Sequence, residues 1–240
     1  SMTRFHNLCA LLSSFVIMFP VLAGAQTPDE DPEPGPSFKW GHAIRQANRF
    51  LMIEHLFRLG TEPGTREGLK GPFWRDYGRS VRSLRGWGDG DPFLVNYIGH
   101  PMGGAVAGFI AVQNDIRYRR VQFGRSPHYW KSRLRAMAFA AVYSEQFEIG
   151  PISEATIGNI QMSPPGGGIV DHVITPTAGM GWMIAEDALD RYVVRRFERW
   201  TTHRVARILV RGFLNPTRSF SNMLRGKYPW YRDDRGGVSD

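Results

Sequence analysis

A stretch without a single Asp, Glu, Lys or Arg, residues 93–113, most constrains how this chain of 240 residues can fold. His100 and Pro101 interrupt its apolar part, so we expect the helix to begin near Pro101, because proline is favoured in a first helical turn. Gly104 and Gly108 lie four residues apart, a spacing that lets a second backbone approach closely. The stretch therefore predicts a helix packed tightly in a core. The alternative, a membrane-embedded helix, needs about 20 mainly apolar residues and is disfavoured by the polar interruptions.

The rest of the body also follows helical spacing. Apolar residues recur three to four positions apart over residues 41–59, 73–84, 127–147, 169–200 and 204–212. Glycine and proline mark the breaks, which predicts loops at residues 60–71, 86–92, 163–168 and 215–220. No convincing run of alternating strand residues is present. The expected fold is mainly α, a compact helical bundle with glycine-rich central helices and irregular loops, in a single domain over residues 39–240.

Residues 1–25 have the pattern of a secretory signal peptide. A basic start precedes an apolar run over residues 8–22, and a small-x-small pattern ends at Ala25. An uncleaved membrane anchor is the alternative, although the run is shorter than a spanning helix needs. Residues 26–38, rich in proline and acids, are expected to form a solvated linker. Export would remove Cys9, the only cysteine, and would leave neither disulfides nor thiol chemistry.

The charge of the chain points to an anionic partner. It carries 30 Lys and Arg against 22 Asp and Glu, a net charge of +8. Basic and aromatic residues gather toward the C-terminus, and the candidates for contact with a membrane or an anion are Arg191, Arg195, Arg199, Trp200 and Arg207. Such a basic amphipathic segment suits an anionic membrane surface. A solvated face whose apolar residues turn into the core is the alternative. Nucleic acid is not an expected partner, because export would separate the protein from it.

Polar residues in apolar surroundings are the candidates for chemistry. Glu145 and Glu148 lie three positions apart and share one face of a helix, and Asp171 and His172 open the last long helix. If His100 converges with two of these carboxylates between helices, the group can hold a divalent metal ion or perform general acid–base catalysis. The alternative is a buried hydrogen-bond network that holds the helices in register. The sequence contains no metalloprotease, nucleophile-elbow or phosphate-loop motif.

For other acidic residues and histidines, the sequence predicts a role or a position only in general terms. Glu186 and Asp187 lie farther along the last long helix and are further candidates for polar chemistry. His42, His55 and His128 are expected at the surface or at helix ends.

Three stretches resemble those of a known family, and one of them is the acidic segment from Ser144-Glu145 to Glu154. The other two carry more specific motifs. The residues are Asp91-Pro92-Phe93, Asn96, His100-Pro101 and Gly104, followed by Asp171, Thr175-Pro176 and Gly179. Their order and spacing resemble the NPF-x2-N-x3-HP-x2-G and D-x3-TP-x2-G signature of a family of uncharacterised exported bacterial proteins of unknown function. Asp91 stands where that family usually has asparagine. The resemblance implies an envelope protein, associated with the outer membrane, and it singles out His100, Asp171 and Thr175, but it brings no known activity.

Two expectations about function follow. The first is a non-enzymatic protein of the bacterial cell envelope, in the periplasm or at the outer membrane, with a structural or binding role at an anionic membrane surface or envelope component. The second is a lipid- or envelope-directed hydrolase whose catalytic residues, His100, Glu145, Glu148 and Asp171, lie between the helices.

Overall fold

The computed structural model describes residues 37–61, 63–69, 73–82, 84–157 and 168–238. Within these ranges the chain forms helices and two isolated β-bridges but no strand, which confirms the expected mainly α bundle. The signal peptide predicted for residues 1–25 lies outside the described residues, as does nearly all of the linker predicted for residues 26–38. Most of the loop expected at residues 163–168 lies outside them too.

Two of the predicted loops are wrong, because the chain forms helices there. Residues 60–71 contain a short helix, and residues 215–220 belong to the start of another. The elements are α2 (Trp40–Thr61), α3 (Pro63–Gly68), α4 (Phe73–Arg82), the π-helical turn η1 (Val95–Gly99), α5 (His100–Gln113), α6 (Pro127–Ile149), α7 (Val170–Leu189), the π-helical turn η3 (Asp190–Val194), α8 (Arg195–Trp200), α9 (Arg204–Leu214) and α10 (Pro216–Leu224). The helix predicted over residues 169–200 is thus divided by η3.

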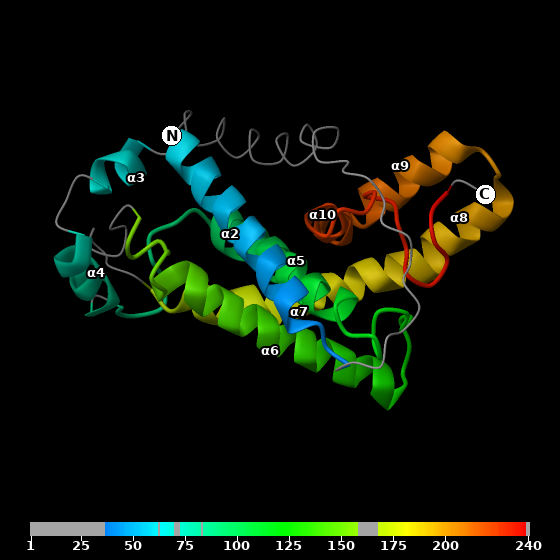
Figure 1. Cartoon of the computed structure of the whole chain (residues 1–240), viewed down its shortest axis with the longest axis horizontal. Helices are drawn as coiled ribbons and strands as arrows, with labels where there is room; N and C mark the ends of the chain where they lie inside the picture. Colours follow the sequence, from blue (N-terminus) through cyan, green and yellow to red (C-terminus); the bar gives the residue numbers. More distant parts are fainter. Residues whose placement is uncertain (1–36, 62, 70–72, 83, 158–167, 239–240) are drawn as a thin grey trace.

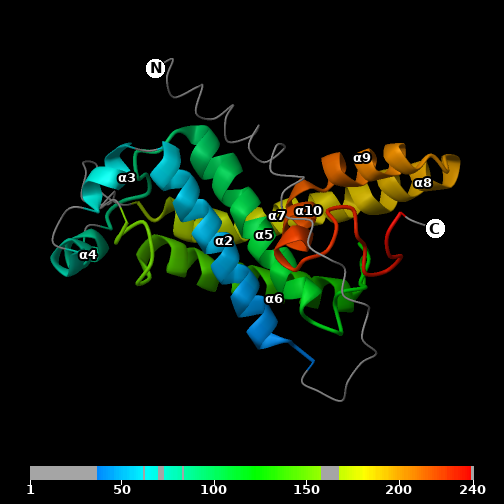
Figure 2. The same cartoon turned by 45° about the horizontal axis from the view of Figure 1, so that its top comes forward.

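Helices α5, α6 and α7 form the centre of the molecule and pack most extensively against one another. Helix α2 crosses this centre, α3 and α4 lie at one end, and α8 and α9 lie at the opposite end (Figure 1). After a rotation of the molecule, α8 and α9 are seen side by side, extending away from the central helices (Figure 2). We call these two helices the α8–α9 hairpin.

Helix α5 is surrounded by other helices, and this explains its lack of charge. Residues 104–113 are all buried. One core cluster joins α5 to α2, α6 and α10, and a second joins it to α6 and α7. Central members of the two clusters are Phe50, Val106, Ile110, Tyr143 and Phe220, and Ala105, Phe109, Ala136 and Met183. The uncharged stretch therefore contains the core helix that the sequence predicts.

None of the described helices combines the length and the apolar character needed to cross a membrane.

Glycines set the distance between α5 and α7. A Cβ atom on Gly104 would overlap the carbonyl oxygen of Thr175, and one on Gly179 would lie 2.9 Å from the carbonyl carbon of Gly104. Only glycine lets two backbones approach this closely. His100 lies one turn before Gly104, and Asp171 lies one turn before Thr175. The same contact therefore fixes the separation of two candidate site residues.

A network of ion pairs holds the C-terminal residues against η3. The buried guanidinium of Arg232 donates to Asp190 at 3.0 Å and to Asn215 at 2.8 Å, and Arg235 contacts Asp190 at 2.9 Å and Glu198 at 3.0 Å. Burial acts to raise the pKa of Asp190, but the hydrogen bond from Arg235 and the charge of Arg232 outweigh it. The pKa is therefore held below its ordinary value of 3.8.

The glycine contact predicts a difference between two alanine variants. Gly104→Ala should lower the free energy of unfolding by about 1–3 kcal/mol, because its methyl group overlaps the backbone of α7. Gly181→Ala, on the exposed side of α7, meets no atom within 4 Å and should leave that free energy unchanged or raise it by up to about 1 kcal/mol. Urea unfolding measures both, and equal values for the two variants would contradict the close crossing.

The ion-pair network predicts a loss of stability in acid. Because its folded pKa is depressed, Asp190 contributes stability above its unfolded pKa near 3.8, and this contribution is lost as the pH falls below that value. Asp190→Asn leaves the buried Arg232 without its charge partner and should cost about 3–5 kcal/mol at neutral pH. Unfolding of both proteins at pH 6 and pH 3 provides the test. If the free energy of unfolding falls between pH 6 and pH 3 by as much in the variant as in the parent, Asp190 is not the cause of the acid sensitivity.

Candidate functional site

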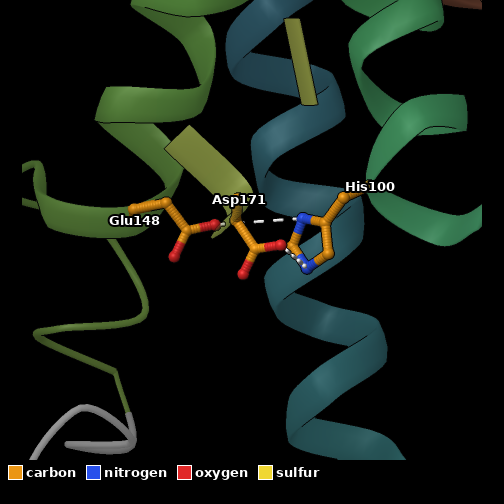
Figure 3. A group of neighbouring side chains, drawn as sticks. All are labelled: His100, Glu148 and Asp171. Carbon is orange, nitrogen blue, oxygen red and sulfur yellow. Dashed lines mark ion pairs between the residues drawn. The ribbon is translucent and has the colours of Figure 1, made fainter. Parts of the chain in front are cut away.

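Three side chains from the three central helices meet at one end of the bundle. His100 is the first residue of α5, Glu148 lies in the last turn of α6, and Asp171 lies in the first turn of α7. They point toward one another (Figure 3). Nδ1 of His100 lies 3.9 Å from Oε1 of Glu148, and Nε2 lies 3.6 Å from Oδ1 of Asp171. We call these three residues the His100 cluster.

The local sequence explains two of the three positions. Pro101 has no backbone N–H, and at this point the chain changes from the π-helical turn η1, in which the N–H of His100 donates to the carbonyl of Val95, to the α-helix α5. Asp171 lies at the positive end of the dipole of α7, which favours a carboxylate. Glu148 lies at the negative end of α6, where a carboxylate is disfavoured. The stability of α6 therefore does not explain why a glutamate occupies position 148.

Burial shifts the titration of all three groups. Burial lowers the pKa of His100 to about 4, so the imidazole is neutral at pH 7. It raises the pKa of Glu148 well above its ordinary value, and the negative charges of Glu154 and Asp171 act in the same direction. Burial also raises the pKa of Asp171 to about 9, together with a hydrogen bond to Asp89 and the charge of that residue. Without a cation, the cluster therefore retains protons at neutral pH.

Asp89 is a neighbour of the cluster that sequence reasoning missed. The N–H groups of Ile169 and Val170 donate to the carbonyls of Gly86 and Trp87, which brings the turn before η1 against the start of α7. Asp89 there accepts hydrogen bonds from Nδ2 of Asn96 at 2.8 Å and from the N–H of Asp91 at 2.9 Å. The signal in the sequence was an aspartate in a glycine-rich turn just before the uncharged stretch, but only the folded chain places it beside Asp171.

Several buried polar atoms near the cluster lack hydrogen-bond partners among the described residues. They are Oδ1 of Asp171, Oδ1 of Asn96 and Oγ1 of Thr175, one turn beyond Asp171 on α7. Most buried polar atoms in folded proteins have a partner, so such a group needs an explanation.

The structure places Glu145, His172 and three other histidines outside the His100 cluster. Glu145 is exposed and contacts Nδ1 of the partly buried His172 at 2.9 Å, and neither residue belongs to the His100 cluster. His55, expected at the surface or at a helix end, is instead buried mid-helix, because its ring stacks on Phe147 at a centroid distance of 5.2 Å. His42 and His128 are exposed, as expected.

Glu186 and Asp187 have structural roles. The carboxylate of Glu186 accepts hydrogen bonds from the N–H groups of Thr217 and Arg218, at 2.9 and 3.1 Å, and so caps the N-terminus of α10. This cap explains why residues 215–220 start a helix instead of forming the expected loop. Asp187 pairs with the buried Arg133 at 2.6 Å and accepts a hydrogen bond from Tyr129.

The predicted arginine and tryptophan surface divides into an inward and an outward set. Arg195 forms an ion pair with Asp234, and Arg207 donates to the backbone carbonyls of Thr201 and Glu198, both at 2.7 Å. Arg207 thus ties α9 to the end of α8, and Arg195 ties α8 to the C-terminal segment. The exposed residues of the original set are Arg191, Arg199 and Trp200.

Comparisons of the chain with protein-family models, with curated proteins and with solved structures found no match. The candidate site therefore rests on its residues and geometry, and the motif resemblance stays a prediction.

Proposed function

We propose that this protein is a non-enzymatic protein of the bacterial cell envelope that binds an anionic membrane surface through its α8–α9 hairpin. The observation that carries the proposal is the inverted polarity of α9. Arg207 and Arg211 face the protein, whereas Val205, Leu209 and Phe213 face solvent.

The inverted polarity follows from the partners of the side chains. Arg211, buried on the inner face of α9, pairs with Glu198 and donates to the carbonyl of Trp230 at 2.8 Å. On the outer face Val205, Leu209 and Phe213 recur every four residues, and each leaves half or more of its surface exposed. Contiguous exposed apolar surface of this kind is typical of an interaction site.

The remaining exposed residues of the hairpin favour a lipid surface as the occupant. Trp200, 82% exposed, lies where α8 ends, and Tyr192 is exposed on η3. Exposed cations accompany them, namely Arg191, Arg196, Arg199 and Arg204. Tryptophan and tyrosine favour the boundary between lipid and water. A basic residue close to an anionic membrane contributes about 1 kcal/mol.

The location in the envelope rests on the sequence. The predicted signal peptide and the motif resemblance both support export, in the periplasm or at the outer membrane. An anionic lipid surface or another anionic envelope component is then the partner that the charge of the chain favours.

Vesicle binding tests the proposal. The full chain, expressed so that any processing takes place, should sediment with vesicles of phosphatidylcholine and phosphatidylglycerol, and should be released by high salt. The double variant Trp200→Ala, Phe213→Ser should bind about tenfold more weakly, because two apolar contacts are lost. Trp74→Ala is the matched control, an exposed tryptophan on α4 at the opposite end, and it should bind like the parent.

Two outcomes would contradict membrane binding by the hairpin. One is sedimentation that does not depend on anionic lipid or on the double variant. The other is a dimer in solution that the double variant dissociates, which would make a second copy of the chain the occupant of this surface.

A further inference from the structure

We propose that the His100 cluster binds one divalent metal ion, which joins α5, α6 and α7 at the end of the bundle opposite the α8–α9 hairpin. One atom each from His100, Glu148 and Asp171 lies within 4.8 Å of the other two. This site is independent of the proposed membrane binding.

The distances within the cluster fit a shared cation better than direct hydrogen bonds. The separations of 3.6 and 3.9 Å between His100 and its two carboxylates exceed the usual hydrogen-bond range. Two ligands of a tetrahedral zinc ion, each about 2.1 Å from the metal, lie about 3.4 Å apart. The two separations involve different ring nitrogens, Nδ1 and Nε2, and one ion binds only one of them. With one ligand atom from each residue, the three atoms lie within 4.8 Å of one another, so side-chain movements of about an ångström would bring them to this spacing.

Asp171 supplies a second, independent observation. Its side chain is 5% exposed, and its Oδ1 atom points toward His100 without a hydrogen-bond partner among the described residues. A buried carboxylate oxygen left in this state is unfavourable unless a proton or a cation occupies the position. A metal ion would satisfy this atom from within the cluster.

Neighbouring residues already provide the outer support that metal ligands need. Asp171 lies beside Asp89, which accepts a hydrogen bond from Asn96 at 2.8 Å. With a metal ion on Asp171, the proton that the two carboxyls share would lie on Asp89. Such partners orient ligands and tune the affinity of metal sites. The edge of the His100 ring lies against Phe147, with ring centroids 6.2 Å apart, and this contact restricts its rotation. Asp171 and His100 therefore have neighbours that restrict their orientation before an ion binds.

The donor set selects the kind of ion. One imidazole nitrogen with carboxylate oxygens suits zinc or manganese, whereas calcium and magnesium prefer oxygen ligands alone. Glu148 and Asp171 are buried, His100 is partly buried, and the three residues come from three different helices. We therefore assign the ion a structural role in holding the helices together, in preference to the hydrolytic role considered from the sequence.

Metal analysis of the full chain tests the proposal. Protein stripped with a chelator and dialysed against Zn²⁺ or Mn²⁺ should retain about one ion per chain, and the ion should raise the melting temperature. His100→Ala and Asp171→Asn should each weaken binding at least about tenfold. His42→Ala and Glu145→Gln are matched controls, since both residues are exposed and outside the cluster. Circular dichroism of each variant establishes that it is folded.

Three results would overturn the metal site. The first is that the parent protein retains neither ion. The second is that the folded Asp171→Asn protein binds the ion as tightly as the parent, and the third is that Glu145→Gln loses binding to the same extent. If the parent binds no ion and Glu148→Gln is more stable than the parent, the cluster is a protonated hydrogen-bond network. Vesicle binding by the hairpin would be unaffected by any of these outcomes, so the two proposals fail separately.

Discussion

The close contact between α5 and α7 at Gly104 is the constraint on which the rest of the structure depends. No side chain separates the two backbones there, because Gly104 lies against Thr175 and Gly179. Core residues on both sides of α5 then pack around a helix with no charge of its own. One turn before this contact on each helix lie His100 and Asp171, so the packing of glycine determines the geometry of the polar cluster.

Residue patterns predicted the fold class and the core helix, but not the choice among candidate ligands. Glu145 and Glu148 share a face of α6, and only the rotation of that helix against α7 decides that Glu148 turns inward. Likewise, the turn containing Asp89 meets Asp171 through backbone hydrogen bonds between distant segments, which no local pattern encodes. The helix α10 was missed because its cap, Glu186, comes from another helix.

The two proposed sites lie at opposite ends of the molecule and depend on different interactions. At one end, buried carboxyls and a neutral histidine favour a cation. At the other, buried arginines pair with acids and leave the apolar face of α9 in solvent. The arginines of the C-terminal part therefore fall into two sets. One set is buried and holds this part together, and the other remains exposed for an anionic partner.

Anomalous X-ray scattering from crystals grown with Zn²⁺ tests the central claim most directly, since it locates the ion and the helices together. The account predicts one strong peak about 2.0–2.2 Å from a nitrogen of His100 and from carboxylate oxygens of Glu148 and Asp171. It also predicts that Gly104 contacts α7 without an intervening side chain. A map with no peak among these residues, or with His100 remote from both carboxylates, would contradict it.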